Sequence, residues 1–131
     1  MAFEFGVSFV ILPEMRTSSQ KLNPSFQNQI EKTLSQTLVD LKDNKEAEIF
    51  LKDFFNQSEV ETFAKRLAIA YWLTKGRSYT NIKQNLKVSS ATIATVQAQM
   101  DKPGFKLALA KIEAEEWASL WAEKIKKFIK K

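Results

Sequence analysis

The sequence predicts an all-α protein, and three observations lead to that fold class. The 131 residues include only 3 Gly and 3 Pro, so few positions interrupt regular structure. Apolar residues recur mainly at intervals of three and four, which is the period of an amphipathic helix. Residues that favour helix starts and ends separate these apolar runs. The length is that of about one domain, and the 44% hydrophobic content predicts a packed core.

The first 22 residues are expected to form an N-terminal arm before the helices begin. Phe5, Val7, Phe9 and Ile11 alternate with smaller residues. This alternation is compatible with a loose arm and equally with a short pairing strand.

Asn23 predicts the start of the first helix, because its side chain can accept hydrogen bonds from free backbone N–H groups. The following Pro24 already has a helical φ. The apolar stripe of this helix is Phe26, Ile30, Leu34, Leu38 and Leu41. A second, short helix carries a dense apolar face formed by Ala47, Phe50, Leu51, Phe54 and Phe55.

The third predicted helix opens with a capping box formed by Ser58 and Glu61. We expect it to end at Gly76, which follows Lys75 and can adopt the left-handed conformation common after a helix. The core-facing side of this helix consists of Val60, Phe63, Ala64, Leu67, Ala68 and Tyr71.

Two short helices, Tyr79–Leu86 and Ser90–Met100, are expected next, and residues 101–104 interrupt the pattern. A last amphipathic helix begins at about Phe105 and carries Phe105, Leu109, Ile112, Trp117, Leu120, Trp121, Ile125 and Phe128. This helix can pack on the core of the protein or on its own copy. Its aromatic residues beside a Lys-rich end also suit a partner or a membrane surface.

The residue types that are missing exclude most catalytic chemistry. There is no Cys and no His, so Cys nucleophiles, imidazole acid–base catalysis and Cys/His metal sites are absent. No carboxylate pair, phosphate loop or nucleophile–base set is present, and we expect neither an enzyme nor a cofactor. No apolar run is long enough for a membrane span. The apolar start carries Glu4 and leads into Pro13, which makes a poor secretory signal, so we expect a cytoplasmic protein that does not bind membranes.

Positive charge is concentrated in the middle of the chain. Residues 62–100 contain six basic residues and no acidic residue, whereas residues 1–61 contain six basic and ten acidic residues. A basic segment of this kind suits a polyanion such as double-stranded DNA, because neutralised phosphates release condensed counterions.

The two short helices have the apolar spacing of a helix-turn-helix, whose helices must pack at a steep angle. Ile82 and Leu86 form the inner face of the first helix, Val88 fills the turn, and Ile93 and Val96 form the inner face of the second. Ser89 can cap the second helix. The outward positions are then the small residues Ser90, Ala91, Ala94, Thr95 and Ala98.

Small outward side chains allow the helix Ser89–Met100 to enter the major groove, where hydroxyls can bond base edges and methyl groups can contact thymine. Phosphate contacts are expected at the start of the preceding helix and beside it. The predicted DNA-binding residues are Arg77, Ser78, Thr80, Lys83, Lys87, Ser89, Ser90, Ala91, Thr92, Ala94 and Thr95. The alternative is a helical interaction or assembly module whose helix-turn-helix is only a packing device and does not bind DNA.

Two positions differ from the common helix-turn-helix pattern. Lys83 stands where a small residue usually eases the helix crossing, and Lys87 stands where the turn usually has Gly. If the usual turn is kept, Lys87 must adopt a strained left-handed backbone conformation.

The segment Ser58–Met100 resembles the Trp repressor family, particularly its Trp-repressor-like branch. The matching features are Lys65-Arg66, the turn Lys75-Gly76-Arg77-Ser78-Tyr79, the pair Ile82 and Leu86, and the run Ser90-Ala91-Thr92-Ile93. With the upstream helices, the resemblance covers about residues 25–100. The DNA-binding domain at the C-terminus of the replication initiator is a more distant match.

The resemblance implies an intertwined all-helical homodimer that reads successive major grooves. We divide the chain into the arm 1–22, a Trp-repressor-like helix-turn-helix domain 23–101 and an extra C-terminal amphipathic helix 102–131, which extends beyond the resemblance. In the Trp repressor, two arginines hold a small corepressor; Arg66 matches the first, but Thr95 occupies the position of the second. Thr95 cannot clamp a carboxylate, which argues against tryptophan control. We therefore expect a sequence-specific transcription regulator, with Arg66 and Thr95 as the candidate positions for any effector.

Overall fold

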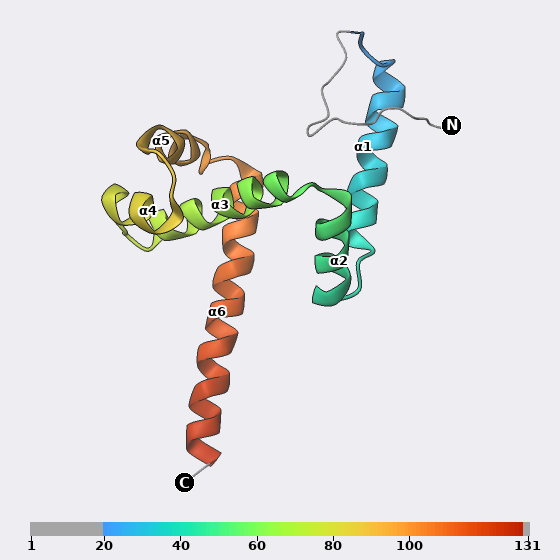
Figure 1. The fold of residues 1–131 in the computed structure, drawn as a ribbon. Helices are drawn as coiled ribbons and strands as arrows, with labels where there is room; N and C mark the ends of the chain where they lie inside the picture. The colour runs from blue at the N-terminus through green and yellow to red at the C-terminus, as the bar shows by residue number, and fades with distance from the viewer. Residues whose placement is uncertain (1–19, 130–131) are drawn as a thin grey trace. The chain divides into compact units, whose positions relative to one another are not determined.

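The computed structural model describes residues 20–129, and Figure 1 shows their helices in order. The chain is all-helical, as predicted, and no strand occurs in residues 20–129. The choice between a loose arm and a short strand concerned residues that lie outside this range. The helices are α1 (Pro24–Val39), α2 (Asn44–Phe54), α3 (Gln57–Thr74), α4 (Tyr79–Leu86), α5 (Ser90–Gln99) and α6 (Pro103–Ile129).

The starts of α1 and α2 are determined by local side-chain caps. The Asn23 side-chain oxygen accepts hydrogen bonds from the backbone N–H groups of Ser25 and Phe26, which confirms the predicted cap of α1. Asp43 caps α2 by accepting a hydrogen bond from the backbone N–H of Glu46. Both caps satisfy N–H groups that have no partner within the helix.

The predicted capping box of α3 was wrong by two residues. The Asn56 side chain accepts a hydrogen bond from the backbone N–H of Glu59 at 2.8 Å, and the Glu59 carboxylate accepts one from the backbone N–H of Asn56 at 2.9 Å. Ser58 lies inside the first turn of the helix. Asn and Ser are equally good capping residues, and both Asn56 and Ser58 have a Glu three residues later. The sequence therefore contains two capping-box patterns, and the helix uses the first.

Gly76 ends α3 as predicted. It has a φ of +79°, and its N–H donates to the carbonyl of Leu73 while the N–H of Arg77 donates to the carbonyl of Trp72. These two bonds form a Schellman motif, which pairs carbonyl groups that the end of a helix leaves free. The left-handed conformation is readily adopted by Gly because it has no Cβ.

The chain divides into two compact units between Val60 and Glu61. In the first unit, α1 and α2 contain no buried residue. Phe50, Phe54 and Phe55 contact one another through their rings, with centroid distances of 4.9 to 6.0 Å. The stripe of α1 is largely exposed, with Phe26 at 53% and Ile30 at 45% of their full accessibility. These helices therefore do not bury their apolar faces within one copy of the unit.

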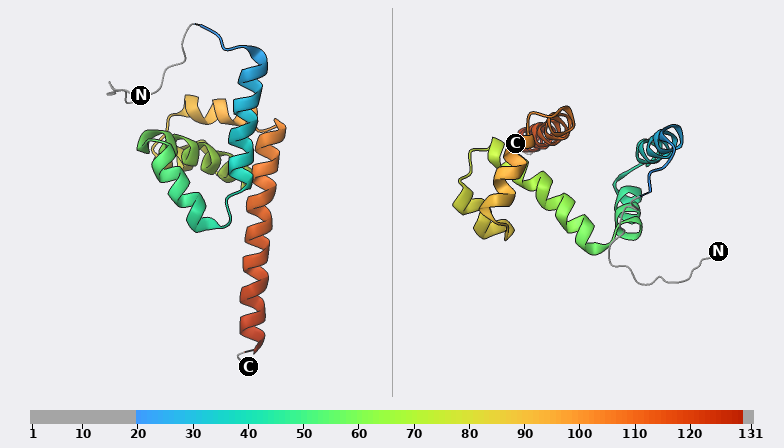
Figure 2. Two further views of the ribbon diagram at one scale, coloured as in Figure 1. Left: turned by 90° about the vertical axis from the view of Figure 1, so that its right-hand side faces the viewer. Right: turned by 90° about the horizontal axis from the view of Figure 1, so that it is seen from above.

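The second unit contains the hydrophobic core. The buried residues come from four helices and are Ile69 and Ala70 of α3, Ile82 of α4, Ile93 and Val96 of α5, and Leu109 of α6. Figure 2 shows α4 and α5 beside each other near one end of α3. Burying these side chains away from water is the main force that orients the two short helices.

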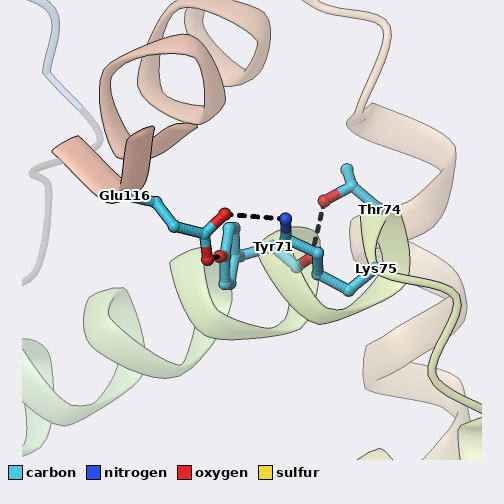
Figure 3. A network of polar contacts seen from close by, with 4 residues as sticks. All are labelled: Tyr71, Thr74, Lys75 and Glu116. Carbon is cyan, nitrogen blue, oxygen red and sulfur yellow. Dashed lines mark hydrogen bonds and ion pairs between the residues drawn. The ribbon is translucent and has the colours of Figure 1, made fainter. Parts of the chain in front are cut away.

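The helix α6 begins at Pro103, two residues earlier than predicted, because Pro is well accommodated at the first helical position. A polar cluster joins it to α3 (Figure 3). The Lys75 ammonium lies 2.8 Å from a carboxylate oxygen of Glu116, and the Tyr71 hydroxyl donates to the other oxygen. These contacts connect residues that are about 40 positions apart in the sequence.

The hydrogen bond from Lys75 and then that from Tyr71 hold the pKa of Glu116 below its ordinary value of 4.5. The hydrogen bond to Glu116 correspondingly raises the pKa of Lys75 and that of Tyr71. The contribution of Glu116 to stability is therefore present above the ordinary carboxyl pKa and is lost as the pH falls through the lowered one. The connection between α3 and α6 thus persists throughout the neutral range.

Candidate nucleic-acid interface

The helices α4 and α5 are joined by three residues, Lys87 to Ser89, and form the predicted helix-turn-helix. The Ser78 hydroxyl oxygen caps α4 by accepting from the backbone N–H of Asn81 at 3.1 Å. The Ser89 hydroxyl oxygen caps α5 by accepting from the backbone N–H of Thr92 at 3.1 Å. The boundaries of α4 agree with the prediction, and α5 ends one residue earlier, at Gln99.

The predicted apolar positions of this motif are confirmed. Ile82 and Ile93 are completely buried, and Val96 is 4% exposed. Leu86 and Val88 are half-buried and pack against the same core. Lys83 is exposed, so its side chain does not occupy the crossing between the two helices. The long side chain is thus accommodated without disturbing the packing.

Lys87 adopts the left-handed conformation, with φ 56° and ψ 52°, so the usual turn is kept although Lys stands in place of Gly. It is the only non-glycine residue with a positive φ among those described. Its N–H donates to the carbonyl of Lys83, so the conformation terminates α4. For a residue with a Cβ this conformation costs about 1–2 kcal/mol, and the packing of Ile82 and Ile93 on either side of the turn maintains it.

We expect Lys87→Gly to be more stable than Lys87→Ala by about 1 kcal/mol, because only Gly relieves the left-handed strain. Both variants remove the same charge, so the comparison isolates the backbone effect. Urea unfolding followed by circular dichroism measures the difference. Equal stability of the two variants would show that the turn relaxes when Lys87 is replaced.

The outward face of α5 consists of small residues, as predicted. Ser90, Ala91, Ala94, Thr95 and Ala98 are all exposed. The Thr95 hydroxyl donates to the carbonyl of Ala91 at 2.9 Å, so its oxygen can still accept and its methyl group can still make contacts. The Ser89 and Thr92 hydroxyls lie 3.0 Å apart at the start of the helix.

The predicted phosphate-contacting residues are also exposed, and they lie on or next to α4. They are Arg77, Ser78, Thr80, Lys83 and Lys87. Arg77 is held in place, because its guanidinium carbon lies 4.1 Å from the ring centroid of Trp72 and one of its nitrogens donates to the Asn81 side chain at 3.2 Å. A guanidinium has five N–H donors, so donors remain for another ligand.

The sequence analysis missed the hydrogen bond that connects the two helices. The Tyr79 hydroxyl at the start of α4 donates to the side-chain oxygen of Gln97 near the end of α5. No local pattern links these two residues, since they are 18 positions apart and both are of types that are common on surfaces. The bond adds a polar contact to the apolar packing that sets the angle of α5.

A pocket of about 410 Å³ lies between α3 and α5. It brings together Arg66 and Thr95, the two candidate effector positions, together with residues that the sequence analysis did not single out. The lining residues are Glu61, Thr62, Lys65, Arg66, Ile69, Val88, Thr92, Thr95, Val96 and Gln99. All of its charged side chains belong to α3, and Lys65 pairs with Glu61 there at 3.2 Å.

Comparison with known proteins identifies the family of the chain. The family model described as the Trp repressor protein matches residues 29–113, which include the whole helix-turn-helix. The chain belongs to the Trp repressor family. The crystal structure of a TrpR like protein from Eubacterium eligens has a TM-score of 0.63 and 26% identity, over 70% of this chain and 96% of that one. An uncharacterized Bacillus subtilis protein, YerC, is 28% identical over 88 residues, which are 66% of this chain and 85% of YerC.

The pocket of this Trp repressor family member is asymmetric in charge. Arg66 on α3 can approach an anionic group, but Thr92, Thr95 and Gln99 on the α5 side carry no charge. A carboxylate therefore cannot be held between two cations from opposite walls. Arg66 also lies over the ring of Phe63, with 5.5 Å between the guanidinium carbon and the ring centroid.

Within residues 20–129, no helix of this family member is both long and apolar enough to cross a membrane. The same part of the chain contains no group of three or more His, Cys, Asp or Glu side chains placed to hold a metal ion.

Proposed function

We propose that this member of the Trp repressor family is a sequence-specific DNA-binding transcription regulator that reads the major groove with α5. The observation that carries the proposal is the arrangement of α4 and α5. The start of α5 presents only small exposed side chains, and the surrounding residues 62–100 contain six basic and no acidic residues. A helix of this kind fits the major groove, which is about 12 Å wide.

The side chains at the interface divide into two kinds of contact. Ser90, Ala91 and Thr95 lie where base edges can be read by hydroxyl and methyl groups. Arg77, Lys83 and Lys87 supply positive charge for phosphates, which positions the protein but carries no sequence information. The Ser78 and Ser89 hydroxyl oxygens accept hydrogen bonds from their own helices, and accepting these bonds does not use the O–H groups, which can donate to a phosphate oxygen.

We propose that the regulator acts as a homodimer. The exposed stripe of α1 and the absence of buried residues in α1 and α2 leave apolar surface that a second copy can cover. A two-fold axis then presents two copies of α5 to half-sites about 34 Å apart. Control by tryptophan is not part of the proposal, because the α5 side of the pocket lacks a cation.

The decisive experiment is selection of preferred sites from a pool of random duplexes, followed by affinity measurements on the selected duplex. We expect a palindromic site and an affinity that falls by about 10³-fold or more between 50 mM and 200 mM salt if six or more phosphates are contacted. Failure to enrich any site, together with an affinity that does not change with salt, would favour the interaction module that does not bind DNA.

A further inference from the structure

The helix α6 has a second apolar stripe that the core of its unit does not use. Leu109 is only 7% exposed and belongs to the core cluster, Phe105 packs against that cluster, and Ile112 is half-buried. A different series, Leu107, Ala110, Ala114, Trp117 and Trp121, is exposed along the helix. Residues two positions apart in a helix lie about 200° apart around its axis, so the two series occupy different sides.

The bare stripe has the spacing of a coiled-coil seam. From Leu107 to Trp121 its members follow one another at alternating intervals of three and four residues, which is the heptad pattern, and the next position of the pattern is Lys124. Within its unit, the C-terminal half of α6 extends beyond the other helices in Figures 1 and 2. Trp117 is 63% exposed and Trp121 is 47% exposed, although their rings contact each other at 5.7 Å.

The net charges on either side of the tryptophan pair have opposite sign. Residues 111–116 contain three Glu and one Lys, and residues 122–127 contain one Glu and three Lys. Parallel pairing of two such helices would place like charges side by side. Antiparallel pairing instead places the acidic end of each helix beside the basic end of the other, which is the favourable arrangement.

We propose that the C-terminal half of α6 pairs in antiparallel orientation with α6 of a second copy of this chain. In the heptad register, Trp117 packs against Trp121 of the second copy, and Leu120 lies beside Leu120 of the second copy. Glu113 then faces Lys127 of the second copy across the edge of the seam. The register joins the bulkiest exposed residues of both helices and satisfies the charges at both ends.

The exposed tryptophans supply apolar area for such a contact. A Trp side chain buries about 150–250 Å², and the four tryptophans of two copies are about half exposed, so they supply roughly 300–500 Å² of the roughly 1,000 Å² of a specific interface. Leu120 is 54% exposed and Ile125 is 53% exposed, so both have area to bury. Lys75 and Tyr71 hold Glu116 on the side of α6 that faces α3, which leaves the stripe turned away from its own unit.

This pairing does not depend on DNA binding, and most of the segment lies beyond residue 113, where the family match ends. The experiment uses the absence of Cys from the chain, because introduced thiols are then the only reactive ones. The full chain carrying Glu113→Cys is co-expressed with the full chain carrying Lys127→Cys, and a short bis-maleimide is added without DNA. We expect about tenfold or more cross-linked dimer from the mixture than from either variant alone, because pairing gives a high effective concentration.

Leu120→Cys alone should cross-link to itself, and Ser119→Cys, on the other side of the helix, should not. Self-cross-linking of both Glu113→Cys and Lys127→Cys would indicate parallel pairing and overturn the proposal. Absence of cross-linked dimer from both the co-expressed mixture and Leu120→Cys would also overturn it. Vesicles of anionic phospholipid provide the final comparison: sedimentation of the chain with them, without any cross-linking, would show that the stripe serves a lipid surface instead.

Discussion

Simultaneous replacement of Lys83 and Lys87 by alanine is expected to weaken binding to every duplex by about 100-fold or more at moderate salt. A dimer would lose four phosphate contacts, and the slope of log affinity against log salt would become less steep by about 4. The loss should be the same for a selected site and for an unrelated duplex, since phosphates carry no sequence information. Fluorescence anisotropy over a series of salt concentrations measures both quantities.

Lys45→Ala with Lys52→Ala is the matched control for charge. Both residues are exposed on α2, outside the basic segment, and their replacement makes the same change in net charge. We expect this variant to bind duplexes with nearly unchanged affinity. An equal loss in both double variants would mean that only net charge matters, and a loss confined to one duplex sequence would contradict a phosphate role for Lys83 and Lys87.

Ile93→Ala is expected to lower the free energy of unfolding of the second unit by about 2–4 kcal/mol. Ile93 is completely buried where α5 packs on Ile69 and Ile82, and truncation removes apolar contacts and leaves a cavity. Because these contacts also orient α5, we expect weaker duplex binding at temperatures near the unfolding transition. Chemical denaturation followed by circular dichroism measures the change in stability.

Val39→Ala provides the corresponding control on stability. Val39 ends α1 and is 76% exposed, so its truncation should change the free energy of unfolding by less than about 0.5 kcal/mol. If Ile93→Ala were as mild as Val39→Ala, then the packing of α5 would not hold the helix-turn-helix together, and the buried position of Ile93 would have to be reconsidered.

Local signals predicted the helices and most of their ends. Asn23, Ser89 and Gly76 act through hydrogen bonds to residues two to five positions away, so neighbouring sequence contains all the information that they need. The left-handed conformation of Lys87 was expected if the usual turn is kept, because Lys87 stands where that turn usually has Gly. The Asn56 cap was missed because two equivalent start signals lie two residues apart and only one can be used.

The exposed residues of the α4–α5 interface could also be predicted from local sequence. The helical period separates Ile93 and Val96 from Ala91, Ala94 and Thr95, and burial of the first two leaves the others outward. The pocket between α3 and α5 was not predictable in its composition. Its lining depends on the angle at which α5 docks, which the sequence spacing alone does not specify.

The amino-acid order was thus enough to establish the helical segments, the inner and outer faces of the motif, and the family resemblance, because these depend on short-range periodicity and capping. Only the folded chain revealed that Tyr79 bonds Gln97, that Glu116 joins α6 to α3, and that the apolar stripe containing Trp117 turns away from the core. Such features require residues distant in the chain to meet, and that meeting is decided by how the buried side chains pack together.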